Sequence, residues 1–159
     1  MDKLLKILEN NPDLTNKELA VMTGLTEEEV AAAIAQYKEA GIIIGKRTVI
    51  NWHKADKNLV TAFIEVKVTP QMGQGFDRIA KRFFQFDQVK TVYLMSGGYD
   101  LALIVEGDNL NDVATFVSEN LAPMEMVLST ATHFVLKKYK SDGLIIEKPS
   151  EDERQVLLF

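Results

Sequence analysis

Two adjacent helix starts within residues 15–41 constrain the fold of this chain more than any other feature. Each start fits a capping box, in which a threonine hydroxyl and a glutamate carboxylate satisfy backbone amides that have no partner inside the helix. The pairs are Thr15 with Glu18 and Thr26 with Glu29. Between them, Gly24 can take the positive φ at which many helices end. With a third amphipathic segment at residues 2–10, this pattern predicts a helix-turn-helix module.

The chain divides into two modules that differ in the periodicity of their apolar residues. The helical module is expected to end at residue 51, after residues 42–50, which are typical of a short strand pair or wing. Residues 52–60 are interpreted as a hinge and residues 61–140 as the second module. A tail follows at residues 141–159, with an acidic run and then an apolar run. The sequence leaves open whether this tail is mobile or docks on a partner.

In the second module, apolar residues alternate with polar ones in some segments, as on strands, and follow helical spacing in others. From residue 61 to 69, every second residue is apolar and faces one side, as on a half-buried strand. The expected strands are 61–69, 89–96, 101–106 and 127–137, and the expected helices are 75–86 and 110–121. This order is the ferredoxin-like βαββαβ pattern, so the predicted fold class is α+β, with an N-terminal winged helix-turn-helix domain.

The predicted sheet carries apolar residues on both faces. Two helices cover one face of a four-stranded antiparallel sheet, yet Tyr93, Met95 and the run 101–105 also supply apolar groups to the other. A second copy of the chain is the simplest cover, so we expect a dimer at least. The alternative interpretation is that these are scattered surface residues, which are normal in soluble proteins.

Composition narrows the class of protein. The chain is 47% hydrophobic and 26% charged, contains no apolar run that could cross a bilayer, and opens with charged residues unlike those of a signal peptide. We therefore expect a cytoplasmic protein that does not enter membranes. The absence of cysteine excludes disulfides and thiolate metal sites. A net charge of -5 argues weakly against nucleic-acid binding, although residues 1–60 are nearly neutral, with 8 Lys and Arg against 9 Asp and Glu.

The last helix of a helix-turn-helix normally enters the major groove of DNA, so its outward face matters most. Helical spacing turns Val30, Ile34 and Tyr37 inward and leaves alanines and glutamates outward. The alanines can touch thymine methyl groups, while nearby cations and neutral donors can reach phosphates. The candidate DNA-binding residues are Asn16, Lys17, Thr26, Ala31, Ala32, Ala35, Gln36, Lys38, Lys46 and Arg47.

The same face also supports a different interpretation. Glu27 and Glu28 would stand near phosphates and be repelled, and no Arg or Lys lies among the central outward positions. Acidic residues are ordinary at a helix start, where the helix dipole favours anions. The three helices could therefore form a packing or dimerisation module with no role in DNA binding.

The segment from Tyr93 to Asp100 is the candidate small-molecule site of the second module. Gly97 and Gly98 at a hairpin tip expose backbone amides and allow a ligand to approach closely. Asp100 can accept from an ammonium group and Ser96 can donate to a carboxylate, which suits a zwitterion such as an amino acid. Thr130 and Thr132 could add hydroxyls to the same region. The alternative is that the glycines form only a turn, which Asp100 caps.

Taken together, these features resemble the Lrp/AsnC family of transcription regulators from residue 1 to about 139. Residues 92–100 resemble the family's G-x-x-D hairpin, with Gly97 and Asp100 in the matching places. The resemblance implies that the chain dimerises through its sheet module, assembles further into tetramers or octamers, and binds an amino acid or related metabolite near this hairpin. The implied effector-binding residues are Met95, Ser96, Gly97, Gly98, Tyr99 and Asp100, with Thr130 and Thr132 as weaker candidates. It places the recognition helix at residues 26–40.

Three function classes follow from these patterns. The first is a sequence-specific regulator that binds double-stranded DNA and responds to an amino-acid effector. The second is a metabolite-binding oligomer whose helix-turn-helix mediates protein contacts. The third, an enzyme, has little support: His53 and His133 are the only histidines, and no catalytic constellation, metal-ligand cluster or cofactor motif accompanies them. We therefore expect no enzyme activity, no metal and no cofactor.

Overall fold

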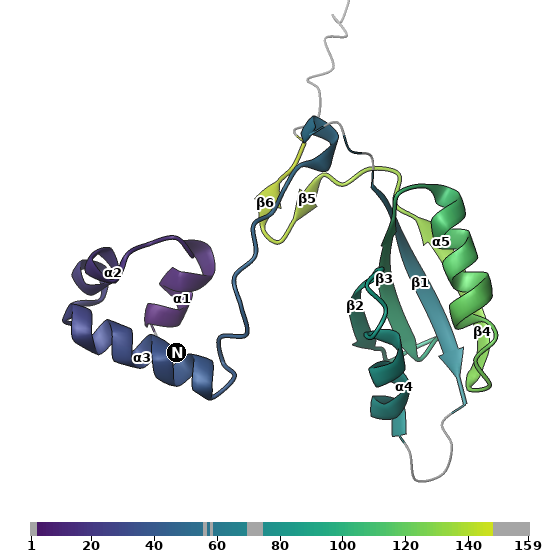
Figure 1. Cartoon of the computed structure of the whole chain (residues 1–159), viewed down its shortest axis with the longest axis horizontal. Helices are drawn as coiled ribbons and strands as arrows, with labels where there is room; N and C mark the ends of the chain where they lie inside the picture. The colour runs from purple at the N-terminus through teal and green to yellow at the C-terminus, as the bar shows by residue number, and fades with distance from the viewer. Residues whose placement is uncertain (1–2, 56, 58, 70–74, 148–159) are drawn as a thin grey trace, which may run out of the picture. The chain divides into compact units, whose positions relative to one another are not determined.

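The chain folds into two compact units, one ending at Thr48 and the other beginning at Val49. The computed structural model describes residues 3–55, 57, 59–69 and 75–147. Figure 1 shows the elements of each unit, and each unit is described by itself below.

The first unit consists of three helices, α1 (Lys3–Asn10), α2 (Asn16–Thr23) and α3 (Glu27–Glu39). Their shared core contains Leu4, Leu19, Ala20 and Val30, all buried. Ile34 and Tyr37 are partly buried against this core, together with Ala33, so the inward face that helical spacing predicted for α3 is confirmed. The helix-turn-helix is thus built on a small apolar core that fixes which side of α3 faces outward.

The strand pair predicted over residues 42–50 is wrong, because residues 42–50 contain no strand. The amides of Ile42 and Ile43 both donate to the carbonyl of Tyr37, at 2.8 and 3.0 Å. A strand pair requires such amides to bond across to a second strand. Here the carbonyl of Tyr37, at the end of α3, accepts from both amides instead, so this segment does not form a hairpin.

The second unit is a four-stranded antiparallel sheet with the order β2-β3-β1-β4. Its elements follow the predicted βαββαβ order, and they confirm the predicted fold class of this module. Along the chain they are β1 (Val60–Val68), α4 (Gly75–Phe83), β2 (Val89–Leu94), β3 (Leu101–Gly107), α5 (Leu110–Phe116) and β4 (Val127–Phe134). A π-helical turn, η2 (Val117–Leu121), extends α5.

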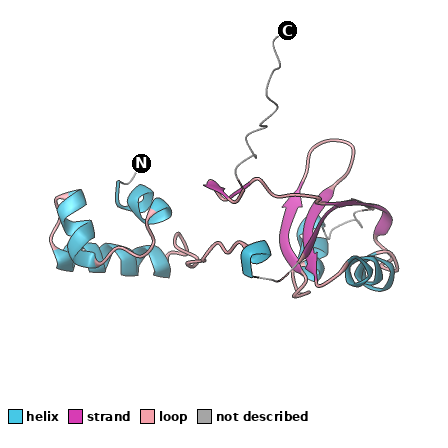
Figure 2. Ribbon diagram, turned by 90° about the horizontal axis from the view of Figure 1, so that it is seen from above, coloured by secondary structure: helices cyan, strands magenta, loops and turns pink. Residues whose placement is uncertain are grey.

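Helices α4 and α5 lie on the same side of the sheet (Figure 2). Ile79 and Phe83 of α4 and Val113 and Phe116 of α5 share one core with strand residues such as Ile64. Helix α4 ends earlier than the sequence predicted. The chain turns after Phe83 so that the Phe86 ring meets Phe116 edge to face, with centroids 5.3 Å apart. Phe86, which the sequence placed in this helix, therefore lies beyond its end and contacts α5.

Two short elements flank the sheet in sequence. A 3-10 turn, η1 (Trp52–Ala55), lies within the segment interpreted as a hinge. A small hairpin of β5 (Lys140–Ser141) and β6 (Leu144–Ile145) lies at the start of the predicted tail. It is tied to the segment before β1, because the Asn51 side-chain amide donates to the Ile146 carbonyl at 3.2 Å. The acidic and final apolar runs of the tail lie outside the described residues.

Candidate DNA-binding and effector-binding sites

Both predicted capping boxes are present and fix where α2 and α3 begin. At α3, the Thr26 amide donates to Glu29 Oε2 at 2.8 Å and the Glu29 amide donates to Thr26 Oγ1 at 3.2 Å. Thr15 and Glu18 make the same exchange at α2. Hydrogen bonds from the Thr15 amide and hydroxyl hold the pKa of the Glu18 carboxyl below its ordinary value. The start of the candidate recognition helix is thereby set by local hydrogen bonds.

The turn between α2 and α3 depends on one glycine. Gly24 has φ of 81°, and its amide donates to the Ala20 carbonyl at 2.9 Å. Residues with a Cβ rarely adopt this backbone conformation, so Gly24 is the residue that allows α3 to follow α2 at this angle. The helix-turn-helix geometry therefore follows directly from the sequence.

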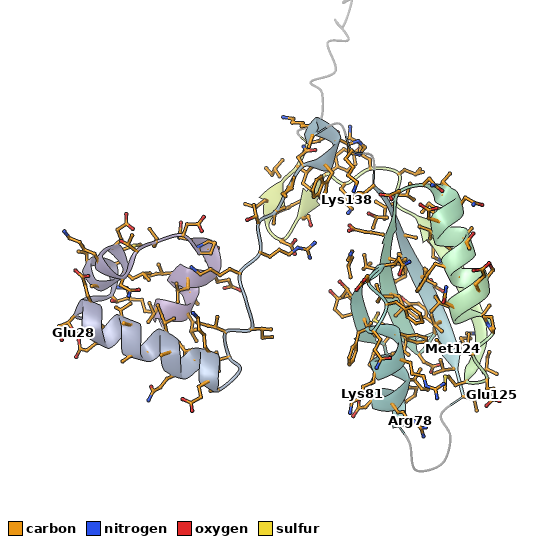
Figure 3. All side chains as sticks on the ribbon, viewed as in Figure 1. Glu28, Arg78, Lys81, Met124, Glu125 and Lys138 are labelled. Carbon is orange, nitrogen blue, oxygen red and sulfur yellow. The ribbon has the colours of Figure 1, made fainter. Side chains whose placement is uncertain are left out.

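All the candidate DNA-binding residues are exposed. On α3 these are Ala31, Ala32, Ala35, Gln36 and Lys38, and around it Asn16, Lys17, Thr26, Lys46 and Arg47. Glu28, labelled in Figure 3, is exposed near the start of α3 and belongs to the same outward surface. The surface thus offers methyl groups along α3, carboxylates in its first turn and cations at its edge.

Part of the cationic edge is tied to the first unit. The Lys46 ammonium donates to the carbonyl of Pro12, in the loop between α1 and α2. This contact holds residues 42–47 beside the helices although they form no strand. Arg47 follows directly and is exposed, so two adjacent cations stand next to the helix-turn-helix.

The hairpin between β2 and β3 is anchored to the end of β1 by Asp100. The Asp100 amide donates to the Val66 carbonyl at 3.1 Å, and Asp100 Oδ2 accepts from the Val68 amide at 2.8 Å. The Met95 amide donates to the Asp100 carbonyl at 2.8 Å and closes the hairpin. At the tip, Gly97 has a φ of 143°, a backbone conformation that residues with a Cβ rarely adopt. Asp100 therefore has a structural role in the hairpin.

The Tyr99 side chain of the hairpin packs on the sheet face opposite the helices. Its ring meets Phe63 edge to face, with centroids 6.2 Å apart. Phe63 also stacks near His133 of β4, whose Nε2 lies 3.3 Å from Glu65 Oε1. We call these four residues the Phe63 cluster. Sequence reasoning missed the cluster: strand alternation put Phe63 and Glu65 on one face, but the cross-strand partner His133 depends on register.

Thr130 and Thr132 lie on the other side of the sheet from the Phe63 cluster. They pair directly with Val66 and Ile64, and directly opposed residues of antiparallel strands point to the same face. Val66 and Ile64 belong to the core under the helices. The structure therefore brings Met95 to Asp100 together in one hairpin but separates the two threonines from Tyr99 within one chain.

Two family models account for most of the chain. Residues 3–44 match winged helix-turn-helix DNA-binding domains, and residues 61–145 match the Lrp/AsnC ligand binding domain. The chain belongs to the Lrp/AsnC family. It is a transcriptional regulator with a DNA-binding and a ligand-binding domain, and not an enzyme.

Relatives of known sequence agree with this assignment to the Lrp/AsnC family. The chain is 43% identical to the uncharacterized HTH-type transcriptional regulator YugG of Bacillus subtilis, over 98% of this chain and 94% of the relative. It is 28% identical to the leucine-responsive regulatory protein of Rhizobium meliloti, over 87% of this chain and 88% of the relative. Both alignments run across the helix-turn-helix and the sheet module.

Solved structures show that this Lrp/AsnC chain has the same fold as other regulators. The leucine response regulatory protein LrpA of Mycobacterium tuberculosis superimposes with a TM-score of 0.76 at 20% identity, over 92% of this chain and all of that one. The regulator NMB0573 of Neisseria meningitidis, solved as a complex with L-Met, superimposes with a TM-score of 0.71 at 24% identity, over 89% of this chain and 93% of that one. Among the described residues, no helix has the length and apolar character needed to span a membrane.

Proposed function

We propose that this Lrp/AsnC regulator binds specific double-stranded DNA, and that an amino acid or related metabolite changes its assembly and DNA affinity. The observation that carries the proposal is the joining of an exposed, doubly capped helix-turn-helix to a ligand-binding domain in one chain. Asn16, Lys17 and Thr26 lie where the helices start, and Lys38, Lys46 and Arg47 supply charge for phosphates. Ala31, Ala32, Ala35 and Gln36 then face the bases.

The effector site is proposed at the β2–β3 hairpin, from Met95 to Asp100. Exposed backbone at Ser96, Gly97 and Gly98 offers donors to a carboxylate, and Asp100 offers a carboxylate oxygen to an ammonium group. The complex of the Neisseria regulator with L-Met supports an amino acid as the class of ligand. Thr130 and Thr132 stay weaker candidates.

Assembly is proposed to begin with a dimer that covers the sheet face carrying the Phe63 cluster. Tyr93 on this face is 54% exposed, although it is a large aromatic side chain. Burial of such a face in a second copy removes apolar area from water and is the usual basis of a twofold dimer. Further association of dimers into tetramers or octamers would place several weak helix-turn-helix units on one DNA segment.

One observation favours a second candidate function. The outward surface of α3 combines Glu27 and Glu28 with alanines and contains few cations. Such a surface could contact protein and leave DNA unbound, in which case the chain would be a metabolite-binding oligomer whose helix-turn-helix mediates protein contacts.

A mobility-shift titration on the DNA upstream of the protein's own gene separates the two candidates. The DNA regulator predicts a shift at low salt that weakens steeply at moderate salt, because phosphate contacts release counterions. A random fragment of equal length is the control for specificity. No shift at low salt, from protein shown to be folded and oligomeric, would favour the second candidate.

A further inference from the structure

A carboxylate lies in the middle of the sheet face opposite the helices (Figure 2). Glu65 belongs to the interior strand β1, and Ala102 of β3 and Ala131 of β4 stand directly opposite it. Directly opposed residues of antiparallel strands point to the same face, so methyl groups flank the carboxylate on both sides. The Glu65 side chain is 34% exposed, so water still reaches it in the single chain. A second copy over this face would remove that water, and burying a carboxylate costs free energy unless a positive charge compensates it.

The side chain that can supply this positive charge is His133. Its Nε2 lies 3.3 Å from Glu65 Oε1, and the imidazole is 58% exposed. Among the described residues, His133 is the side chain that forms an ion pair with Glu65, and it does so only when the imidazole is protonated. Histidine as a class changes charge between about pH 5 and pH 8. The charge balance at the middle of the face therefore depends on pH in the physiological range.

The other charged groups of this face are engaged elsewhere or lie further along the strands. At one end, the Lys138 ammonium lies 3.2 Å from Glu106 Oε1. In the hairpin, the Asp100 carboxylate accepts from a backbone amide of β1. Lys67 is two residues from Glu65 along β1, opposite Ser129, and forms no ion pair with it in the described part of the chain. The titratable groups that complete the face are the phenols of Tyr93 and Tyr99.

We propose that dimerisation over this face takes up protons at His133, so that the dimer becomes stronger as the pH falls from about 8 to about 6. The inference rests on the dimer interface proposed above. In the single chain, water solvates the Glu65 carboxylate whether or not the imidazole is charged. In the dimer that water is lost, and the protonated imidazole becomes the counter-charge. The dimer therefore binds more protons than two separate chains, and acid favours the state that binds more protons.

The symmetry of a twofold dimer limits the size of this effect. Such a dimer contains two pairs of His133 with Glu65, so it takes up two protons at most. The dissociation constant of the dimer can then rise by at most about a hundredfold for each pH unit. Because histidine is partly protonated across this range, we expect a smaller change, of about tenfold between pH 6 and pH 8. Mild acidification would thus strengthen the assembly of the regulator without an effector.

Sedimentation velocity at pH 6 and pH 8, at one ionic strength, tests the proton uptake in the full chain. The parent should dissociate about tenfold more readily at pH 8. Glu65→Gln removes the charge that needs compensation, so its dimer should be equally strong at both pH values and at least as strong as the parent dimer at pH 8. His133→Gln cannot take up the proton, so its dimer should be as weak at pH 6 as the parent dimer is at pH 8. A pH dependence that persists in His133→Gln would overturn the proposal.

The chain offers a matched control for histidine titration. His53, in η1, is the other histidine of the sequence. His53→Gln changes the same chemical group at a position outside the sheet face, so it should keep the full pH dependence of the parent. If His53→Gln abolishes the pH dependence as His133→Gln does, the effect does not belong to the pair with Glu65 and the proposal is wrong.

Phe63→Asp separates the proton uptake from the interface on which it rests. If Phe63→Asp dissociates the dimer but pH leaves the parent dimer unchanged, the proton uptake is overturned and the proposed interface stands. If the dimer persists in Phe63→Asp, or if the folded parent is monomeric at both pH values, the proposed interface is wrong and the proton uptake falls with it.

Discussion

Asp100 and Val68 are joined by a hydrogen bond of 2.8 Å from the Val68 amide to the Asp100 carboxylate. The residue proposed to hold the ammonium group of an effector therefore also fixes the hairpin to β1. Because Asp100 would have both roles, the mutation that tests the effector site must keep its hydrogen bond to Val68. Removing the whole side chain would loosen the hairpin, so loss of an effector response would have two possible causes.

The variant Asp100→Asn separates these causes. Its amide oxygen can still accept from Val68, so stability should change little, whereas Asp100→Ala should lower the free energy of unfolding by about 1–3 kcal/mol. Loss of the charge should raise the effector concentration needed for a half-maximal response by about tenfold or more, since hydrogen bonds to charged groups contribute about 1.5–3 kcal/mol. Denaturant unfolding and a dose response on both variants provide the measurement. An unchanged dose response in Asp100→Asn would contradict the proposed site.

Phosphate contacts by Lys46 and Arg47 predict a change in salt dependence. Lys46→Glu with Arg47→Glu should lower DNA affinity and reduce the slope of log affinity against log salt by about two. The matched control is Lys81→Glu with Arg82→Glu on α4, which changes the net charge equally in the other unit. Equal losses in both pairs would show that net charge, and not contact, is responsible.

The proposed dimer interface can be tested at Phe63. Phe63→Asp introduces a carboxylate into the face beside Glu65 and should shift the assembly towards monomers in sedimentation experiments. Leu110→Asp is the control, because Leu110 is 57% exposed at the start of α5, on the helix side of the sheet. Far-UV circular dichroism establishes that both variants are folded. A dimer that survives Phe63→Asp unchanged would place the interface elsewhere.

The capping box at α2 predicts a pH dependence with a definite sign. Hydrogen bonds from Thr15 lower the pKa of Glu18 in the folded state. The stabilisation is therefore present above the unfolded pKa of about 4.3 and is lost as pH falls through the lower folded value. Glu18→Gln should be less stable than the parent at neutral pH, and the difference should disappear in acid. A difference that is independent of pH would show that the carboxylate charge contributes nothing.

The capping box at α3 can be tested with a neutral substitution. Thr26→Ala removes the hydroxyl that accepts from the Glu29 amide and should cost about 0.5–2 kcal/mol of stability. Thr48→Ala, at an exposed position outside any helix, is the comparison. Similar unfolding curves for the two variants would mean that the box does not fix the start of α3.

Local patterns account for what the sequence predicted correctly. The capping pairs, Gly24 and the inward residues Val30 and Ile34 act within one or two helical turns, so spacing reveals them. Strand alternation likewise predicted the βαββαβ order. Features that depend on long-range register were not predictable: the bond from Val68 to Asp100 joins residues 32 positions apart.

The prediction that was wrong concerns residues 42–50. Residues 42–50 were expected to form a strand pair or wing, but the amides of Ile42 and Ile43 donate to the Tyr37 carbonyl at the end of α3. Thr130 and Thr132 stay predicted effector contacts, and the register of β4 against β1 puts them on the helix side of the sheet, away from Tyr99 within one chain. One-dimensional spacing encodes neither the hydrogen-bond partner of Ile42 and Ile43 nor the register of β4 against β1.

The proposed regulator binds DNA under the control of a small molecule. The most direct test is fluorescence anisotropy with a labelled fragment of its own upstream DNA, at fixed moderate salt, with and without a pool of the twenty amino acids. We expect the pool to change the apparent affinity by about fivefold or more, as for coupled binding sites, and subdivision of the pool then identifies the effector. An affinity that is the same with and without the pool, for protein that binds the DNA specifically, would contradict control by an amino acid.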